Sequence, residues 1–329
     1  MRAGRARPVR GEKHMQQQGD QPTSRAARLD AFGGPETLEV REVPVPPVGP
    51  GQVRVRVTAA GLNPMDWIMT ADAETAARFG LTLPVGFGTD YAGVVEEVGD
   101  GVSGFAPGDR VFGGALSRSV ADHVVVDATG STAADEIHHT PDGVDDRTAA
   151  ALTIAGRTAA AAVAAVDPGP GDTVLVGGAG GGVGVFAVQL ARLAGARVIG
   201  TGSAASADFL RELGAEPVTY GDGLVDRVRA LAPDRVTAAM DLHGTETVHA
   251  ARELGVEDAR ISTIAARIDG VTAANGASTT AETLEELARR VADGQVRVPV
   301  AATFPIEEIR EAAALQAGRH VRGKVVVEL

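Results

Sequence analysis

Alternating apolar and polar residues in the first part of the chain predict short β-strands. Residues 53–57, Val-Arg-Val-Arg-Val, alternate with period two, as a strand that buries one face does. Further strands are predicted at 93–99, 108–112 and 123–126, with glycine- and proline-rich turns between them. Short strands at this spacing predict an antiparallel, partly closed β domain.

The pattern changes near residue 145. Residues 146–165 are rich in alanine and predict helix in two pieces. From Thr173 onward, apolar strand patterns alternate with helical patterns, beginning with a strand, a glycine-rich turn, a helix and a strand. This alternation is typical of a parallel sheet covered by helices. Later elements are predicted at 281–292 and 306–315, both helices, and at 323–329, a strand that returns to the first domain.

Composition excludes several classes of protein. The chain has 329 residues, which suits two domains, and its 44% hydrophobic and 22% charged residues are values of globular proteins. No apolar run is long enough to predict a membrane span. The absence of cysteine excludes disulfides and thiolate chemistry. The net charge of −12 argues against nucleic-acid binding, and we expect a cytoplasmic protein.

The N-terminal segment differs in charge from the rest. Residues 1–28 carry seven basic and two acidic side chains and lack the apolar stretch of a secretory signal. We expect residues 1–24 to be a disordered basic extension, or the product of an upstream start codon with the functional start near Met15. A nucleic-acid or membrane arm is the lesser alternative.

A glycine-rich turn carries the strongest chemical signal. Residues 174–184 read Val-Leu-Val-Gly-Gly-Ala-Gly-Gly-Gly-Val-Gly, so that Ala179-x-Gly181-x-x-Gly184 follows an apolar strand and opens a helix. Small residues at these positions permit a sharp turn, close approach of backbone N–H groups to a pyrophosphate, and close packing of helix on strand. The helix dipole favours the bound anion. The spacing predicts a dinucleotide site; a flexible linker is the alternative.

The end of the next strand bears on the choice of cofactor. NAD sites usually place an acidic residue there to bind the ribose hydroxyls. This chain instead has Thr201-Gly-Ser-Ala-Ala-Ser206, with no acid before Asp208, which favours NADPH over NADH. Ala204 and Ala205 stand where a cation would assist the 2′-phosphate. An ordinary surface loop with incidental serines is the alternative.

Several ordered motifs together resemble the zinc-independent medium-chain dehydrogenases/reductases of the quinone oxidoreductase branch. The resemblance extends from Ala27 to the C-terminus. The motifs are Ala59-Ala-Gly-Leu-Asn-Pro-Met-Asp66, Gly88-Thr-Asp-Tyr-Ala-Gly-Val-Val95 with Val98-Gly99, Phe105-Ala-Pro-Gly-Asp-Arg-Val111, Ala151-Leu-Thr-Ile-Ala-Gly-Arg-Thr158, the glycine turn, Leu213-Gly-Ala215 before Tyr220, and Gly323-Lys-Val-Val-Val327.

The resemblance implies an α/β fold in which a Rossmann domain, a doubly wound parallel sheet, is inserted in a GroES-like, mainly antiparallel β catalytic domain. The expected boundaries are 25–148 for the first part of the catalytic domain, 149–296 for the Rossmann domain and 297–329 for the return segment. The cofactor is expected in the cleft between the domains. A homodimer joined through Rossmann edge strands, including 270–274, is expected.

The metal ligands of zinc-using relatives are missing. Those relatives carry Cys at the position of Asn63 and Gly-His-Glu at the position of Gly88-Thr89-Asp90. Without cysteine, and with threonine in place of that histidine, this site cannot supply the N and S ligands that zinc prefers, and we expect no zinc. The pair His138-His139 is not a metal site either, because adjacent residues of an extended chain point in opposite directions. A solvated strand or loop is expected there.

The resemblance also implies catalytic candidates. Asn63 is expected beside the nicotinamide, where its amide can orient the ring or a substrate carbonyl, with turn formation before Pro64 as the alternative. Tyr91 is expected either in the substrate pocket or in the core. Asp66 is expected mainly as a helix cap and ranks lower as a catalytic residue.

The remaining implied roles concern the cofactor. Thr158 is expected on the nicotinamide side, or as an ordinary helix residue. Ser203 and Tyr220 are expected near the adenosine 2′-phosphate, and Lys324 near the cleft or as a solvated strand end. The full predicted set of cofactor-binding residues is Asn63, Thr158, Ala179, Gly180, Gly181, Gly182, Val183, Gly184, Ser203, Tyr220, Ser262, Ile264 and Lys324.

These features predict an NADPH-dependent reductase that transfers hydride to a quinone or an activated enone. Without a metal to polarise it, the acceptor must already be electrophilic, and the protein contributes orientation, a dry cleft and hydrogen bonds. The alternatives are an enoyl or 2-alkenal reductase in a biosynthetic pathway and an NADPH-binding protein without turnover. The expected partner is a small molecule, with no nucleic acid and no membrane.

Overall fold

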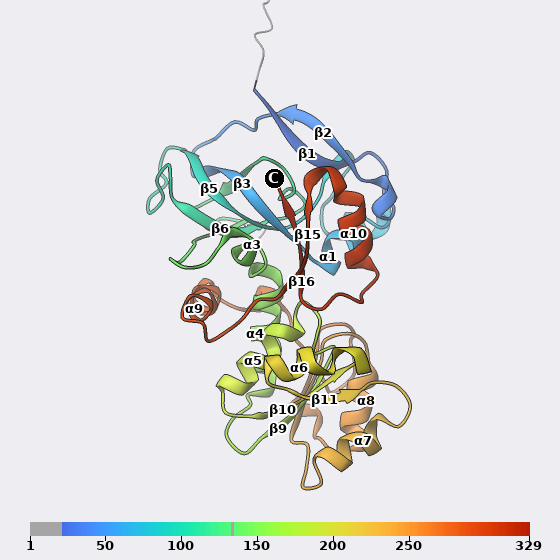
Figure 1. The fold of residues 1–329 in the computed structure, drawn as a ribbon. Coiled ribbons are helices and arrows are strands. Elements are labelled where there is room, and N and C mark those ends of the chain that lie inside the picture. Colours follow the sequence, from blue (N-terminus) through green and yellow to red (C-terminus); the bar gives the residue numbers. More distant parts are fainter. Residues whose placement is uncertain (1–21, 133–134) are drawn as a thin grey trace, which may run out of the picture.

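The computed structural model describes residues 22–132 and 135–329, which form two sheets of different construction and one small sheet (Figure 1). The predicted basic extension lies outside the described residues as far as residue 21. Thr23 and Ser24, which we had placed in the extension, begin strand β1.

The β domain is built around strand β3, Gln52–Leu62. This strand pairs antiparallel with β5, β7 and β16, and the strand order of its sheet is β15-β16-β3-β5-β6-β8. The alternation of valine and arginine in β3 places Val53, Val55 and Val57 in the core. The other strands are β5 Asp90–Val98, β6 Arg110–Ala115, β7 His123–Asp127, β8 Asp135–His139, β15 Val300–Pro305 and β16 Lys324–Glu328.

The C-terminal segment completes this sheet. Strand β16 pairs antiparallel with β3, so that Val325 lies opposite Leu62, and parallel with β15. Figure 1 shows this segment, in red, beside the blue β3. The returning strand predicted at 323–329 is therefore present. Helix α10, Ile309–Ala317, precedes it and covers the small sheet with Ile309, Ala312 and Ala313.

A small three-stranded sheet in the order β2-β1-β4 and three short helices complete the β domain. Their bounds are β1 Thr23–Leu29, β2 Glu39–Pro44, β4 Val85–Gly86, α1 Pro64–Ile68, α2 Ala73–Arg78 and α3 Asp146–Ala149.

The second domain is a six-stranded parallel sheet in the order β11-β10-β9-β12-β13-β14. Numbered within this domain, the order is 3-2-1-4-5-6, the order of a Rossmann sheet. Together with the β domain it confirms the predicted fold class. The strands are β9 Thr173–Gly177, β10 Arg197–Gly202, β11 Glu216–Thr219, β12 Ala238–Asp241, β13 Ile261–Thr263 and β14 Thr272–Ala273.

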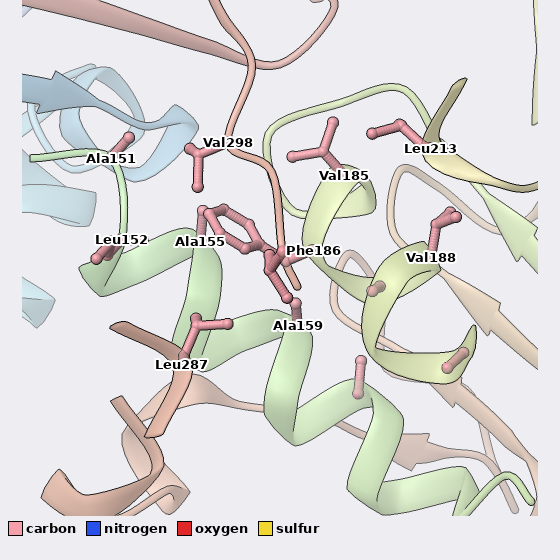
Figure 2. Close-up of a cluster of buried hydrophobic side chains, with 14 of the residues drawn as sticks. Ala151, Leu152, Ala155, Ala159, Val185, Phe186, Val188, Leu213, Leu287 and Val298 are labelled. Atoms are coloured by element: carbon pink, nitrogen blue, oxygen red, sulfur yellow. The ribbon is translucent and has the colours of Figure 1, made fainter. Parts of the chain in front are cut away.

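Helices cover both faces of the parallel sheet and bury its apolar strands. Figure 2 shows the contact between α4 and α5, where the ring of Phe186 lies against Ala155 and Ala159. Alanine on α4 lets the helices approach closely, which explains why this segment is rich in alanine. The helices are α4 Thr153–Val166, α5 Gly184–Leu193, α6 Ala207–Leu213, α7 Leu224–Leu231, α8 Glu246–Glu253 and α9 Ala281–Ala292.

In the described part of the chain, every helix falls short of the length and apolar character that a membrane crossing requires.

Candidate functional site

The glycine turn joins β9 to α5 at the centre of the parallel sheet. Helix and strand approach closely at Gly184: a Cβ there would lie 2.2 Å from the Gly178 carbonyl oxygen and 2.6 Å from the Ala179 carbonyl. Only glycine permits this approach of helix to strand. At Gly181, by contrast, a Cβ would meet a single protein atom, at 3.4 Å. Backbone atoms of residues 178 and 179 therefore fill the space beside Gly184, whereas the space beside Gly181 is open to a ligand.

The turn lies where the order of the parallel strands reverses. Strand β9 has β10 on one side and β12 on the other, and the connections from these strands run in opposite directions. In open α/β sheets this reversal opens a crevice at the carboxyl ends of the strands, where ligands bind. Among the described residues, no hydrogen bond uses the backbone N–H groups of Gly182, Val183 and Gly184. The turn therefore fits a pyrophosphate, which needs donors at a helix N-terminus.

The end of β10 lies beside the end of β11. The Tyr220 backbone N–H reaches the Gly202 carbonyl at 3.4 Å, and the Tyr220 side chain is 54% exposed. The Ser203 hydroxyl lies 3.3 Å from the Ser206 hydroxyl. The structure thus brings Ser203 and Tyr220 to one place at the open end of the sheet, as the sequence predicts.

Arg227 is a residue near this end that the sequence prediction missed. Its guanidinium donates to the carbonyls of Thr219, Tyr220, Gly221 and Asp222. Within the described ranges, no carboxylate forms an ion pair with it. An arginine on α7 gives no sequence signal for this role, because only the turn after β11 brings those carbonyls together.

A cluster of buried polar side chains lies in the β domain beside the glycine turn. The Lys324 ammonium donates to Asn63 Oδ1 at 2.5 Å and lies 3.7 Å from Asp90 Oδ2. Asn63 Nδ2 donates to the same Asp90 oxygen at 3.0 Å. The cluster joins the end of β3, the start of β5 and the start of β16.

Asp66 and Thr89 extend this cluster. The Asp66 carboxylate accepts the Asn63 backbone N–H at 2.8 Å and the Thr89 hydroxyl at 2.8 Å. Asp66 therefore caps α1, as predicted, and in addition fixes the backbone of Asn63. Asn63, Asp66, Thr89, Asp90 and Lys324 form the polar cluster referred to below.

Burial governs the protonation of the polar cluster. It raises the pKa of Asp66 to about 7, with the negative charge of Asp90 acting in the same direction. Burial also raises the pKa of Asp90 to about 6, against the opposing charge of Lys324. It lowers the pKa of Lys324, which the two carboxylates partly restore.

Contacts between the domains connect the polar cluster to the glycine turn. The Gly323 backbone N–H donates to the Gly180 carbonyl at 2.9 Å. A Cβ at Gly182 would lie 3.2 Å from Lys324 Cδ. On the other side, the Ile154 N–H at the start of α4 donates to Asp90 Oδ1 at 3.1 Å. The predicted cofactor turn and Asn63 thus lie against one shared element, the start of β16.

Tyr91 does not join the polar cluster. Because successive side chains of a strand face opposite ways, Asp90 faces the cluster and Tyr91 faces the core of the β domain. The tyrosine is fully buried among Val53, Val55 and Val111, and its hydroxyl donates to the Glu136 carbonyl at 3.0 Å. Of the two predictions for Tyr91, the structure supports the core position, and the substrate-pocket prediction is wrong.

Other predicted cofactor residues use their side chains within the protein. The Thr158 hydroxyl donates to the Ile154 carbonyl on its own helix. The Ser262 hydroxyl is buried and donates to the Ala162 carbonyl. Ile264 is half-buried, and its backbone N–H donates to the Asp241 carbonyl. The Ser262 hydroxyl and the Ile264 N–H are thus both satisfied by groups of the protein.

His138 corrects a further prediction. His139 is exposed, but His138 is 5% exposed, so the expectation of a solvated pair is wrong for His138. Its Nε2 lies 2.9 Å from Glu136 Oε1, and the other Glu136 oxygen accepts from Arg157 on α4. This network links strand β8 to the Rossmann domain.

Comparison with known families covers both domains. Residues 49–123 match the alcohol dehydrogenase GroES-like domain, and residues 213–327 match a zinc-binding dehydrogenase model. Quinone oxidoreductase from Rattus norvegicus is 34% identical over 220 residues, which are 65% of this chain and 64% of the relative. The match thus spans less than two thirds of that relative's length.

A solved structure matches almost the whole chain. It comes from Mycobacterium abscessus and is described as a probable oxidoreductase; it is 30% identical, has a TM-score of 0.79, and the match covers 94% of this chain and 99% of that one. The chain belongs to the medium-chain dehydrogenase/reductase family. Members of this family are nicotinamide-dependent oxidoreductases. The same family fold occurs within larger proteins: a mycocerosic acid synthase-like polyketide synthase from Mycobacterium tuberculosis is 34% identical over 237 residues, 68% of this chain and 10% of the synthase.

The side chains of the polar cluster do not suit zinc. Asn63 and Thr89, which by the resemblance stand in for a cysteine and a histidine of zinc-using relatives, are already hydrogen-bonded within the cluster. A cationic ammonium lies between the oxygens of Asn63 and Asp90. The described residues hold no group of three or more His, Cys, Asp or Glu that could bind a metal ion.

Proposed function

We propose that this protein is an NADPH-dependent, zinc-independent reductase that transfers hydride to a quinone or an activated enone. One observation carries the proposal: the glycine turn at the switch point of the parallel sheet lies directly against the polar cluster of the β domain. A dinucleotide that binds at the turn would extend along the carboxyl ends of the strands toward Asn63.

Each part of the chain has a separate task. When bound, the nicotinamide supplies a hydride, which together with a proton converts a quinone to a hydroquinone or saturates a conjugated double bond. The glycine turn and the N-terminus of α5 bind the pyrophosphate. Asn63, in the polar cluster, lies at the nicotinamide end of the bound cofactor and offers its amide for hydrogen bonds. The apolar surroundings of these groups exclude water and strengthen their hydrogen bonds.

Independence from zinc follows from the donor set. Zinc sites in proteins use thiolate, imidazole and carboxylate ligands at about 2.0–2.3 Å. The chain has no cysteine, and within the polar cluster a lysine ammonium would repel a divalent cation. Without a Lewis acid, the acceptor must be electrophilic itself, which favours quinones and enones over simple alcohols and ketones.

The similarity to a polyketide synthase segment supports the second candidate, an enoyl or 2-alkenal reductase in a biosynthetic pathway. The third candidate is an NADPH-binding protein without turnover. All three share the glycine turn and differ in what occupies the rest of the cleft.

Steady-state NADPH oxidation separates the three candidates. The acceptors are 1,4-benzoquinone, 9,10-phenanthrenequinone and short 2-enones, with NADPH affinity measured separately by quenching of cofactor fluorescence. We expect saturable turnover with the quinones. Turnover with enones alone would support the reductase of the second candidate, and tight binding without turnover the third. Absence of NADPH binding would contradict the whole proposal.

The preference for NADPH is part of the proposal and rests on the end of β10. No carboxylate follows the strand, Ser203 and the exposed Tyr220 offer polar and aromatic contacts, and the Arg227 guanidinium adds positive charge behind them. Ala204 offers no cation, so the pocket relies on Arg227 for charge.

A matched pair of variants at this strand end tests the preference. Ser203→Asp introduces a carboxylate beside the 2′-phosphate, and we expect the Kd for NADPH to rise at least 50-fold while that for NADH changes little. Ala204→Lys supplies a cation, and we expect NADPH to bind about 5-fold more tightly. Equal changes for both cofactors would contradict a 2′-phosphate pocket here.

We also infer a cytoplasmic homodimer. Strand β14 pairs only with β13 among the described strands and leaves an exposed edge, which a second copy can cover. Light scattering should then give twice the chain mass of 33.5 kDa.

A further inference from the structure

Lys324 is exceptional in this chain. Of the 31 Lys and Arg residues only two are lysines, Lys13 and Lys324, so Lys324 is the single lysine among the described residues. It is 2% exposed, whereas the arginines lie mostly at the surface. A chain that places arginine at nearly every cationic position keeps a compact ammonium at this one. A guanidinium is larger and planar and cannot replace an ammonium as a point charge.

The contacts of Lys324 fix the Asn63 amide in one orientation. Asn63 Oδ1 faces the ammonium at 2.5 Å, and Asn63 Nδ2 faces the Asp90 carboxylate at 3.0 Å. Flipping the amide would place its NH₂ against the ammonium and its oxygen against the carboxylate. Both contacts would become repulsive in a buried site, so only the observed orientation is stable.

We propose that the Lys324 ammonium is the resident cation of the polar cluster, and that it positions Asn63 for work at the nicotinamide end of the cleft. The inference rests on the proposed function for the cofactor's location. Lys324 acts through Asn63 and is a positioning residue, not one that touches substrate.

The surroundings of Lys324 connect this role to cofactor binding. Its stem passes Gly182, where a Cβ would lie 3.2 Å from Lys324 Cδ, and the preceding Gly323 donates to the Gly180 carbonyl. A dinucleotide on the turn and the Asn63 amide are therefore held by the same residues. Two carboxylates, those of Asp90 and Asp66, face the ammonium from β5 and α1 and offset its charge.

The first test replaces the ammonium by an apolar side chain of similar length. In Lys324→Met we expect kcat with a quinone to fall at least 30-fold while the Kd for NADPH stays within 3-fold. Lys324→Arg should not restore kcat, because a larger planar guanidinium cannot replace the compact ammonium beside Asn63 and Asp90. The control is Arg322→Met, an exposed cation two residues earlier, which should keep kcat within 2-fold. A kcat for Lys324→Met within 3-fold of wild type would overturn the proposal.

Chemical rescue separates positioning from simple structural support. Lys324→Ala removes the four side-chain atoms that n-propylammonium contains. We expect n-propylammonium to restore kcat at least 5-fold with saturation, and 1-propanol to restore nothing. Equal rescue by both would show that the side chain only fills space. If the single variants do not fold, the double variant Lys324→Met, Asp90→Asn removes both charges together. Its kcat and its Kd for NADPH are then compared with those of wild type.

The wild-type protein offers a readout independent of turnover. With [ζ-¹⁵N]lysine the chain gives two side-chain signals, and Lys13→Arg identifies the one from Lys324. We expect an ammonium signal that shifts in Asn63→Ala and on addition of NADPH. A neutral amine signal, or no shift in either case, would overturn the proposal. If wild type failed to bind NADPH, the proposed function would fail, while the effect of Asn63→Ala would still report on the Lys324–Asn63 contact.

Discussion

The glycine turn and the polar cluster lie against each other, yet the chain builds them in opposite ways. The turn comes from eleven consecutive residues, 174–184, and Gly184, its closest approach of helix to strand, faces only atoms of the turn itself. The cluster joins residues from three distant segments, and the contact between Lys324 and Asn63 spans 261 positions of the sequence.

A motif of consecutive residues and a cluster formed by folding differ in what the sequence reveals about them. A local motif needs only the right neighbours along the chain, so its physical meaning can be predicted without a fold. The cluster exists only because β16 returns to pair with β3, which places Lys324 beside Asn63. The turn alone leads to the prediction of a dinucleotide site, whereas the polar groups beside it become known only from the folded structure.

We expect the largest effects from substitutions at two glycines of the turn, Gly184 and Gly181. In Gly184→Val the new Cβ meets backbone atoms at 2.2 and 2.6 Å, so we expect a loss of about 3 kcal/mol in the free energy of unfolding and no cofactor binding. In Gly181→Val, where a Cβ meets one atom at 3.4 Å, we expect stability within about 1 kcal/mol of wild type and an NADPH Kd at least 100-fold higher. Thermal unfolding and fluorescence titration measure both. Full cofactor affinity in Gly181→Val would falsify the assignment of the turn.

The second prediction concerns Asp66 in the polar cluster. Its pKa is about 7 in the folded protein and near 3.8 when unfolded, so the folded state holds the proton more tightly between these values. This contribution to stability is fully present below about pH 4 and is lost as pH rises through 7. Between pH 5 and 8, wild type should lose on the order of 2 kcal/mol that Asp66→Asn does not lose.

Urea unfolding at several pH values measures the Asp66 effect. Asp90 titrates in the same direction and remains in the variant, so a smaller slope with pH should persist. Parallel curves for wild type and Asp66→Asn would show that Asp66 titrates normally and would contradict the buried cluster.

The smallest expected effect tests the corrected position of Tyr91. Tyr91→Phe removes one buried hydrogen bond, from the hydroxyl to the Glu136 carbonyl, and should cost about 1 kcal/mol of stability. Because the ring lies in the core of the β domain, kcat and KM should stay within 2-fold. A tenfold fall in kcat with unchanged stability would instead place Tyr91 in the substrate pocket.

The sequence placed Asn63 correctly at the end of a strand but did not decide between pocket and core for Tyr91, and both outcomes have one physical reason. Asn63 ends a strand and precedes a proline, so its position is set locally. Tyr91 follows Asp90 in a strand whose two faces are both buried, and its burial pattern carries no alternation that says which face meets the cleft. His138 failed similarly, since only the packing of α4 and α9 against β8 buries it.

For Asp90, the sequence indicates a buried charge but does not identify its partner. A charged residue that opens an apolar strand is a sign of a buried partner, yet nothing local identifies Lys324 as that partner. Arg227 gave no sign at all, because its four carbonyl acceptors come together only in the folded turn after β11.

By itself, the sequence determined the α/β architecture, the parallel sheet with its glycine turn and the absence of cysteine, because periodicity, small residues at a turn and residue identity are local properties. The tertiary structure alone decided which polar groups meet in the polar cluster beside the glycine turn. Contacts across 261 positions depend on strand pairing, and burial, which sets the pKa values of Asp66 and Asp90, arises only once the domains are packed.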